Sequence, residues 1–100
     1  MTTMYIAEFS NIIYDKKGRA TPVAQCPPIA EQVVDFSSVN ESAAFNNNTA
    51  MVRIVCDDIA HLAFGTDPVA NSNNAIKVEA DIPEYFGVFP GQKVSAVQGS

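Results

Sequence analysis

Basic residues are scarce in this sequence of 100 residues, which has six lysines and arginines against eleven aspartates and glutamates. Its formal net charge is −5. Proteins that bind nucleic acids neutralise phosphates with clustered lysine and arginine side chains. The one basic cluster here, residues 16–19, has the composition of a solvated hairpin turn. The sequence therefore argues against a nucleic-acid partner.

Histidine and cysteine are also rare, since the chain has only His61, Cys26 and Cys56. A catalytic or metal-binding role for His61 would need a partner such as Cys56. Residues five apart on a strand, however, lie about 16 Å apart and on opposite faces. The cysteines lack the CxxC spacing of a metal site. They would form a disulfide only if the fold brought them together, and we interpret both as free, buried thiols. His61 is then expected to be a partly buried histidine with a hydrogen bond to the backbone.

The acidic residues do not form a recognisable metal-binding motif either. Asp57-Asp58, and Asp67 followed by the asparagine-rich residues 71–74, lack the alternating oxygen ligands and the glycine of a calcium-binding loop. Both segments are better interpreted as turns. The sequence also contains no glycine-rich phosphate loop and no nucleophile elbow. We therefore expect no catalytic, cofactor or metal site, and hence a protein that is not an enzyme.

Long apolar runs are absent as well. No stretch approaches the ~20 apolar residues of a membrane span. The first residues lack the basic and apolar regions of a signal peptide. We expect a chain that is made in the cytoplasm and has no membrane partner.

β-forming residues between turn signals are what the sequence contains in quantity. Residues 4–14 are rich in such residues, and residues 15–18 have the composition of a hairpin turn. Residues 19–25 would be the return strand, in which Pro22 indicates the edge of a sheet. Residues 1–25 are therefore predicted to be an N-terminal arm or hairpin.

The middle of the chain favours further strands. Residues 29–37 predict a strand, although the first half would tolerate a helical turn after the prolines. Residues 37–49 are predicted to be a loop, with residues 43–45 as an anchor against the domain. The clearest strand is 50–56, and 59–64 follows after the turn at Asp57-Asp58. We expect these two strands to form a central hairpin.

The C-terminal third continues the pattern. Residues 75–80 alternate, which predicts that Ile76 and Val78 point inward. Pro90-Gly91 fits the centre of a type II turn before a last strand over 93–97. Short strands at roughly 8–12-residue spacing indicate a single all-β domain over residues 1–100, a small antiparallel β-sandwich or jelly-roll-like barrel.

Three stretches of the sequence carry a family resemblance. They are residues 27–37 (PPIAEQVVDFS), the set 42–46, 52–55 and 61–68, and residues 83–88 with 90–94. Together they resemble the short β-rich structural proteins of tailed bacteriophages, among them capsid decoration (cement) proteins. The resemblance covers residues 27–97 and includes no catalytic motif, so it implies a place in a virion but transfers no active-site residue.

Within this resemblance, the small size, the β architecture and the low charged fraction of 17% favour a capsid decoration protein. Such a protein would stabilise the head by binding between major capsid subunits. The resemblance implies a virion (capsid) location after assembly in the host cytoplasm. Its partners would be the major capsid protein and copies of the chain itself, as a trimer or dimer.

Two alternatives stay open. The first is a neck, tail or head-fibre component, which is also a virion structural role. The second is a small carbohydrate-binding adhesion module, against which the absence of tryptophan counts.

The predicted subunit interface lies in the N-terminal arm, which is the segment least clearly part of a self-contained core. Its candidate residues are Tyr5, Phe9, Ile12, Ile13 and Tyr14. We expect some of them to contact a neighbouring chain. The alternative is an ordinary edge hairpin that packs on its own sheet.

Overall fold

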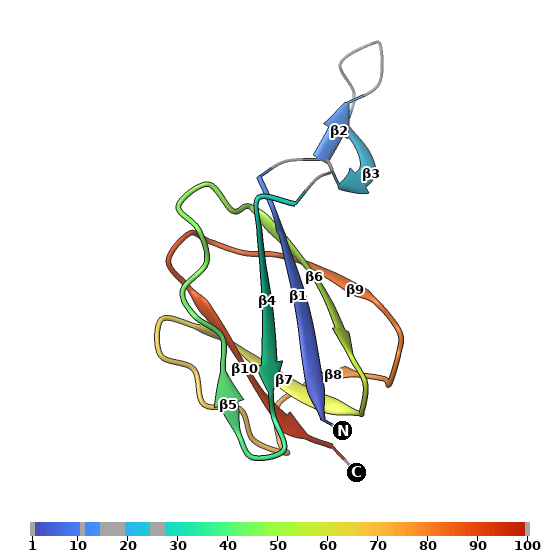
Figure 1. Cartoon of the computed structure of the whole chain (residues 1–100), viewed down its shortest axis with the longest axis vertical. Helices are drawn as coiled ribbons and strands as arrows, with labels where there is room; N and C mark the ends of the chain where they lie inside the picture. The colour runs from blue at the N-terminus through green and yellow to red at the C-terminus, as the bar shows by residue number, and fades with distance from the viewer. Residues whose placement is uncertain (1, 11, 15–19, 25–27, 100) are drawn as a thin grey trace.

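The chain is a two-layered β structure. The computed structural model describes residues 2–10, 12–14, 20–24 and 28–99, and these residues form ten strands and no helix. Two four-stranded antiparallel sheets pack against each other, and a separate two-stranded hairpin extends from one end (Figure 1). The predicted all-β class is confirmed, and the two packed sheets make a small β-sandwich. No helix in the described part of the chain is long and apolar enough to cross a membrane.

The first sheet has the strand order β4-β1-β6-β9. Its strands are β1 (Thr3–Phe9), β4 (Ala30–Asp35), β6 (Met51–Cys56) and β9 (Glu84–Gly87). All neighbours are antiparallel, and β1 pairs with β4 on one side and with β6 on the other. The N-terminal strand is therefore at the centre of this sheet.

The second sheet has the strand order β5-β10-β7-β8. Its strands are β5 (Asn40–Glu41), β7 (Ala60–Gly65), β8 (Ile76–Val78) and β10 (Lys93–Gln98). The turn before β10 has the predicted type II form, since Gly91 has a φ of 82° and the amide of Gln92 donates to the carbonyl of Phe89 at 3.3 Å.

The predicted central hairpin is wrong. The strands expected to form it, β6 and β7, lie in different sheets, and the chain crosses between the layers at Asp57-Asp58. The corner is tied to other strands: Asp57 Oδ1 accepts a hydrogen bond from the amide of Thr3 at 2.6 Å, and Asp58 Oδ2 accepts one from Gln98 Nε2 at 2.7 Å. These bonds to β1 and β10 fix a corner between the sheets in place of a hairpin turn.

The core lies between the two sheets. Both sheets contribute fully buried apolar side chains, which include Met4, Val52, Ile54, Leu62, Val94 and Ala96. Phe36 and Phe45, on the connection between β4 and β6, are also buried. Phe45 is thus the predicted anchor of the loop, whereas its neighbours Ala43 and Ala44 are exposed.

One inward position differs from the sequence prediction. Val78 is buried as predicted, but Ile76 is 39% exposed. Although Ile76 is in register with Leu62, β8 is the outermost strand of its sheet, and no further strand covers it within the described chain. The alternation gave the correct face, while the position at the edge of the sheet leaves the side chain partly in water.

One carboxylate is part of the core. Glu8 is 1% exposed, on the inner side of β1. Its Oε1 accepts hydrogen bonds from the amide of Asn46 at 2.8 Å and from Thr49 Oγ1 at 2.7 Å. Its Oε2 accepts one from Gln32 Nε2 at 2.9 Å. Because buried charges are tolerated only when they are well bonded, these contacts explain how the carboxylate can hold the 42–49 loop against β1 and β4.

The third sheet is the hairpin of β2 (Ile12–Tyr14) and β3 (Ala20–Ala24). The strands pair antiparallel, with Ile12 opposite Ala24 and Tyr14 opposite Ala20. The hairpin projects beyond the end of the sandwich (Figure 1). Since both of its strands are edges, proline at position 22 interrupts no central ladder. The predicted turn over residues 15–18 lies outside the described residues.

Candidate functional site

The described part of the chain has no cluster of three or more histidine, cysteine, aspartate or glutamate side chains that could hold a metal ion. His61 is half-buried, and its Nδ1 lies 2.9 Å from the carbonyl oxygen of Asn74. This is the predicted arrangement of a histidine bonded to the backbone. The geometry gives His61 a role in holding a loop.

Cys56 is a free, buried thiol, as predicted. Burial raises its pKa to about 12, and the negative charge of Asp57 adds to the shift. The thiol is therefore protonated at neutral pH and unsuited to nucleophilic chemistry. Cys26 lies outside the described residues.

We predict that Cys56 is unreactive in the folded protein. In a Cys26→Ser background, an aromatic disulfide reagent at pH 8 should modify Cys56 at least 100-fold more slowly than in 6 M guanidinium, because burial blocks access and suppresses the thiolate. The folded state also holds the proton more tightly than the unfolded state, whose thiol titrates near 9.0. Its contribution to stability is thus complete below about pH 9 and is lost as the pH rises towards about 12. Equal reaction rates with and without guanidinium would contradict the prediction.

The outer face of the second sheet is covered by the chain's own loop. The loop after β7 returns across the face, where the amide of Ala70 donates to Ser95 Oγ at 3.0 Å. Ala70 is 4% exposed and Ser95 is 1% exposed. The His61–Asn74 contact holds the far end of the same loop. This face is therefore largely occupied within the chain.

The outer face of the first sheet is open, and it is the candidate site. Its large apolar side chains are well exposed: Val33 by 68%, Tyr85 by 53% and Tyr5 by 47%. We call this surface the exposed sheet face and define it by the outward residues Tyr5, Ala7, Glu31, Val33, Arg53, Val55 and Tyr85. Such contiguous apolar surface is typical of a contact site for another molecule.

The middle of the exposed sheet face is slightly hollow. Ala7 has a small side chain between larger neighbours, and the resulting hollow has a volume of about 180 Å³. It is lined by Tyr5, Ile6, Ala7, Glu31, Gln32, Val33 and Arg53. One acid, one base and one amide therefore border a depression whose other lining residues are Tyr5, Ile6, Ala7 and Val33, and a side chain of another molecule could enter it.

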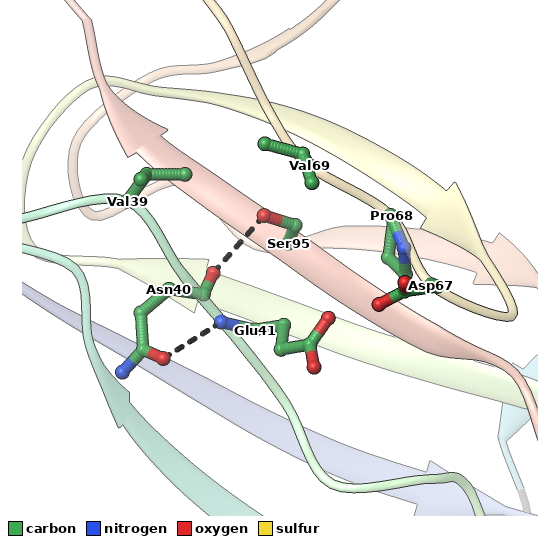
Figure 2. Close-up of a pocket in the computed structure, with 7 residues that line it drawn as sticks. All are labelled: Val39, Asn40, Glu41, Asp67, Pro68, Val69 and Ser95. Atoms are coloured by element: carbon green, nitrogen blue, oxygen red, sulfur yellow. Dashed lines mark hydrogen bonds between the residues drawn. The ribbon is translucent and has the colours of Figure 1, made fainter.

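A second hollow lies on the other side of the sandwich (Figure 2). It has a volume of about 270 Å³ and is lined by Val39, Asn40, Glu41, Asp67, Pro68, Val69 and Ser95. Two of its polar side chains are bonded within the chain: Ser95 Oγ donates to the carbonyl of Asn40 at 3.2 Å, and Glu41 pairs with Lys93 at 3.3 Å. The hollow is open and has an apolar rim, but its polar groups do not converge on a common point.

The predicted interface residues have different positions. Tyr5 is on the exposed sheet face, whereas Phe9 is 4% exposed and buried within its own chain. Ile12, Ile13 and Tyr14 form β2, and their side chains lie outside what the structure describes.

The sequence prediction missed the rest of the exposed sheet face. Adjacent residues of a strand point to opposite faces, so the pair Val33-Val34 requires one exposed valine, and Val34 is the buried one. This valine pair was the feature of the sequence that could have predicted an exposed apolar side chain on β4. The positions of Arg53 beside Ala7 and of Tyr85 beside Arg53 depend on strand order, which the sequence pattern does not specify.

Comparison with known proteins adds no relative. No protein-family model matches the chain, and neither a curated protein nor a solved structure matches it. The phage resemblance therefore stays a prediction.

Proposed function

We propose that this protein is a structural component of a tailed-bacteriophage virion, and that it decorates the capsid by binding between major capsid subunits. The observation that carries the proposal is the exposed sheet face, an open and largely apolar surface on a sandwich whose other outer face is largely occupied by its own loop. The sequence resemblance over residues 27–97 supports the same role.

A decoration protein needs surface complementarity more than chemistry. When another protein covers exposed valine and tyrosine side chains, the free energy of the complex falls by about 25 cal/mol for each Å² of apolar surface that is buried. Many weak contacts of this kind add up when a protein binds at several points of a lattice. The projecting hairpin offers a second contact point at the end of the sandwich (Figure 1).

The test is copy-number mass spectrometry on purified particles of the phage that encodes the chain, with heads and tails separated. The proposal predicts hundreds of copies that travel with the head. A dozen copies or fewer, or recovery with the tail, would contradict decoration and support the neck, tail or head-fibre alternative. Absence from particles would contradict a virion role altogether.

A second candidate function rests on one observation. Tyr5 and Tyr85 are both exposed on the same flat face, two strands apart, and exposed aromatic rings on a flat surface can stack on sugars. A glycan array with the isolated protein tests this function. Binding that is lost in Tyr5→Ala and in Tyr85→Ala would support an adhesion module, and no binding at millimolar glycan would exclude it.

A further inference from the structure

Opposite charges lie on either side of a small residue on the exposed sheet face. Ala7 in β1 is in register with Glu31 in β4 and with Arg53 in β6. Since neighbouring strands are about 4.8 Å apart, the Cα atoms of the acid and the base lie roughly 10 Å apart. No ion pair within 4.0 Å joins Glu31 and Arg53 among the described residues. Glu31 is exposed and Arg53 is half-buried, so both side chains reach the surface of the sheet.

The next row of the same face is apolar. Two residues along the strands, Tyr5 is in register with Val33 on one side and with Val55 on the other. Each row therefore has matching or complementary groups at equal distances from β1. In one row they are a carboxylate and a guanidinium, and in the other they are two valines.

This arrangement is self-complementary about β1. A two-fold axis that runs roughly along β1, midway between the directions of the two β1 strands, would place the β4 side of one copy opposite the β6 side of the other and keep each row at about the same height. We infer that the exposed sheet face packs against the same face of a second copy, with Glu31 of each copy opposite Arg53 of the other. Val33 would then cover Val55 of the second copy, and the two Tyr5 side chains would meet at the centre. The inference does not depend on the proposed virion role. Because the contact uses the face that is proposed to bind the capsid, it describes the free protein, whose second copy the capsid would displace.

Two acidic residues at one end of the exposed sheet face restrict how the two copies can be aligned. Asp35 and Asp57 flank Thr3, and hydrogen bonds from the amide and hydroxyl of Ser37 lower the pKa of Asp35, which keeps it charged. Strands in exact alignment would bring these two acids of different copies together. Twisted sheets pack with their strands about 30° apart, which separates the strand ends and leaves the central rows in contact.

The size of the face predicts a weak dimer. Four strands of about six residues cover roughly 20 Å by 20 Å, or roughly 400 Å² for each copy. A standard stable interface buries about 800 Å² for each partner, so a dissociation constant in the micromolar range or above is expected. The net charge of −5 on each chain also opposes association at low salt.

The test is sedimentation equilibrium of the full chain over 10 µM to 1 mM. The wild type should dimerise, and Glu31→Arg and Arg53→Glu should each weaken the dimer at least ten-fold, because each places like charges opposite one another. An equimolar mixture of the two variants should restore association to within about three-fold of the wild type. In the mixed dimer, the copy with Glu31→Arg presents two bases, which lie opposite the two acids of the copy with Arg53→Glu.

The controls separate this contact from general charge effects and from misfolding. Glu79→Arg and Lys77→Glu make the same charge changes at exposed positions on or next to β8, in the other sheet. At about 0.15 M salt, which screens the net charge, they should change the dissociation constant by no more than about two-fold. Circular dichroism should show that every variant is folded. Val33→Ser should weaken the dimer without changing the charge.

Three results would overturn the inference. They are a wild type that stays monomeric at 1 mM, charge variants that associate as the wild type does, and a mixture that associates no better than its components.

Discussion

Replacing Phe36 with alanine should lower the free energy of unfolding by about 3–5 kcal/mol. Phe36 directly follows β4 and is 0% exposed, and its amide donates to the carbonyl of Thr2 at 2.9 Å. Its ring packs in the cluster between the sheets, with Met4, Ile54 and Leu62 among the other members. Truncation removes the transfer free energy of the ring and leaves a cavity that a close-packed core cannot fill. A domain of this size has about 5–15 kcal/mol of stability in total, so the loss is large.

Urea unfolding followed by circular dichroism measures the effect. The matched control is Phe89→Ala, since Phe89 is 73% exposed and its truncation should change stability by no more than about 0.5 kcal/mol. Equal losses for the two variants would contradict the placement of Phe36 in the core.

Removing the buried carboxylate should have the second-largest effect. In Glu8→Ala, three donors lose their acceptor: the amide of Asn46, Thr49 Oγ1 and Gln32 Nε2. Hydrogen bonds to a charged group contribute about 1.5–3 kcal/mol each, and a buried donor left without a partner adds a desolvation cost. We expect a loss of at least about 3 kcal/mol, with earlier opening of the 42–49 loop in hydrogen exchange.

A conservative variant separates the individual bonds. Glu8→Gln keeps an oxygen for Asn46 and Thr49 but turns an amide towards the amide of Gln32, so its loss should be smaller, about 1–2 kcal/mol. Glu31→Ala removes an exposed carboxylate of the neighbouring strand and should be nearly neutral. A Glu8→Ala protein as stable as the wild type would show that these bonds do not hold the loop.

Local patterns predicted the strands but not their partners. The strand predicted over 50–56 and the β-formers in 4–9 correspond to β6 and β1, and the Pro90-Gly91 turn has the predicted geometry. The hairpin assigned to β6 and β7 was wrong because a two-residue turn can also carry the chain from one sheet to the other. The Asp57-Asp58 corner is a crossing between sheets, and not a hairpin turn, because its side chains accept hydrogen bonds from residues far along the chain.

The site was only partly predictable for the same reason. Tyr5 was identified from its place in the arm, but its neighbours Val33 and Val55 come from strands about 28 and 50 positions along the chain. A contiguous surface depends on strand order and register, which follow from packing over the whole chain. Glu8 was open to prediction, because an acid at an inward position after Met4 and Ile6 breaks the apolar alternation of β1 and requires buried partners.

Stability of phage heads with and without the protein tests the central claim most directly. Heads from a phage that lacks the gene should release their DNA at a lower temperature than complete heads, and added wild-type protein should restore the release temperature. A protein with Tyr5→Ala and Val33→Ser, folded by circular dichroism, should restore it much less, because it lacks the exposed apolar contacts. Heads that are equally stable without the protein, or that do not bind the added protein, would contradict a decoration role.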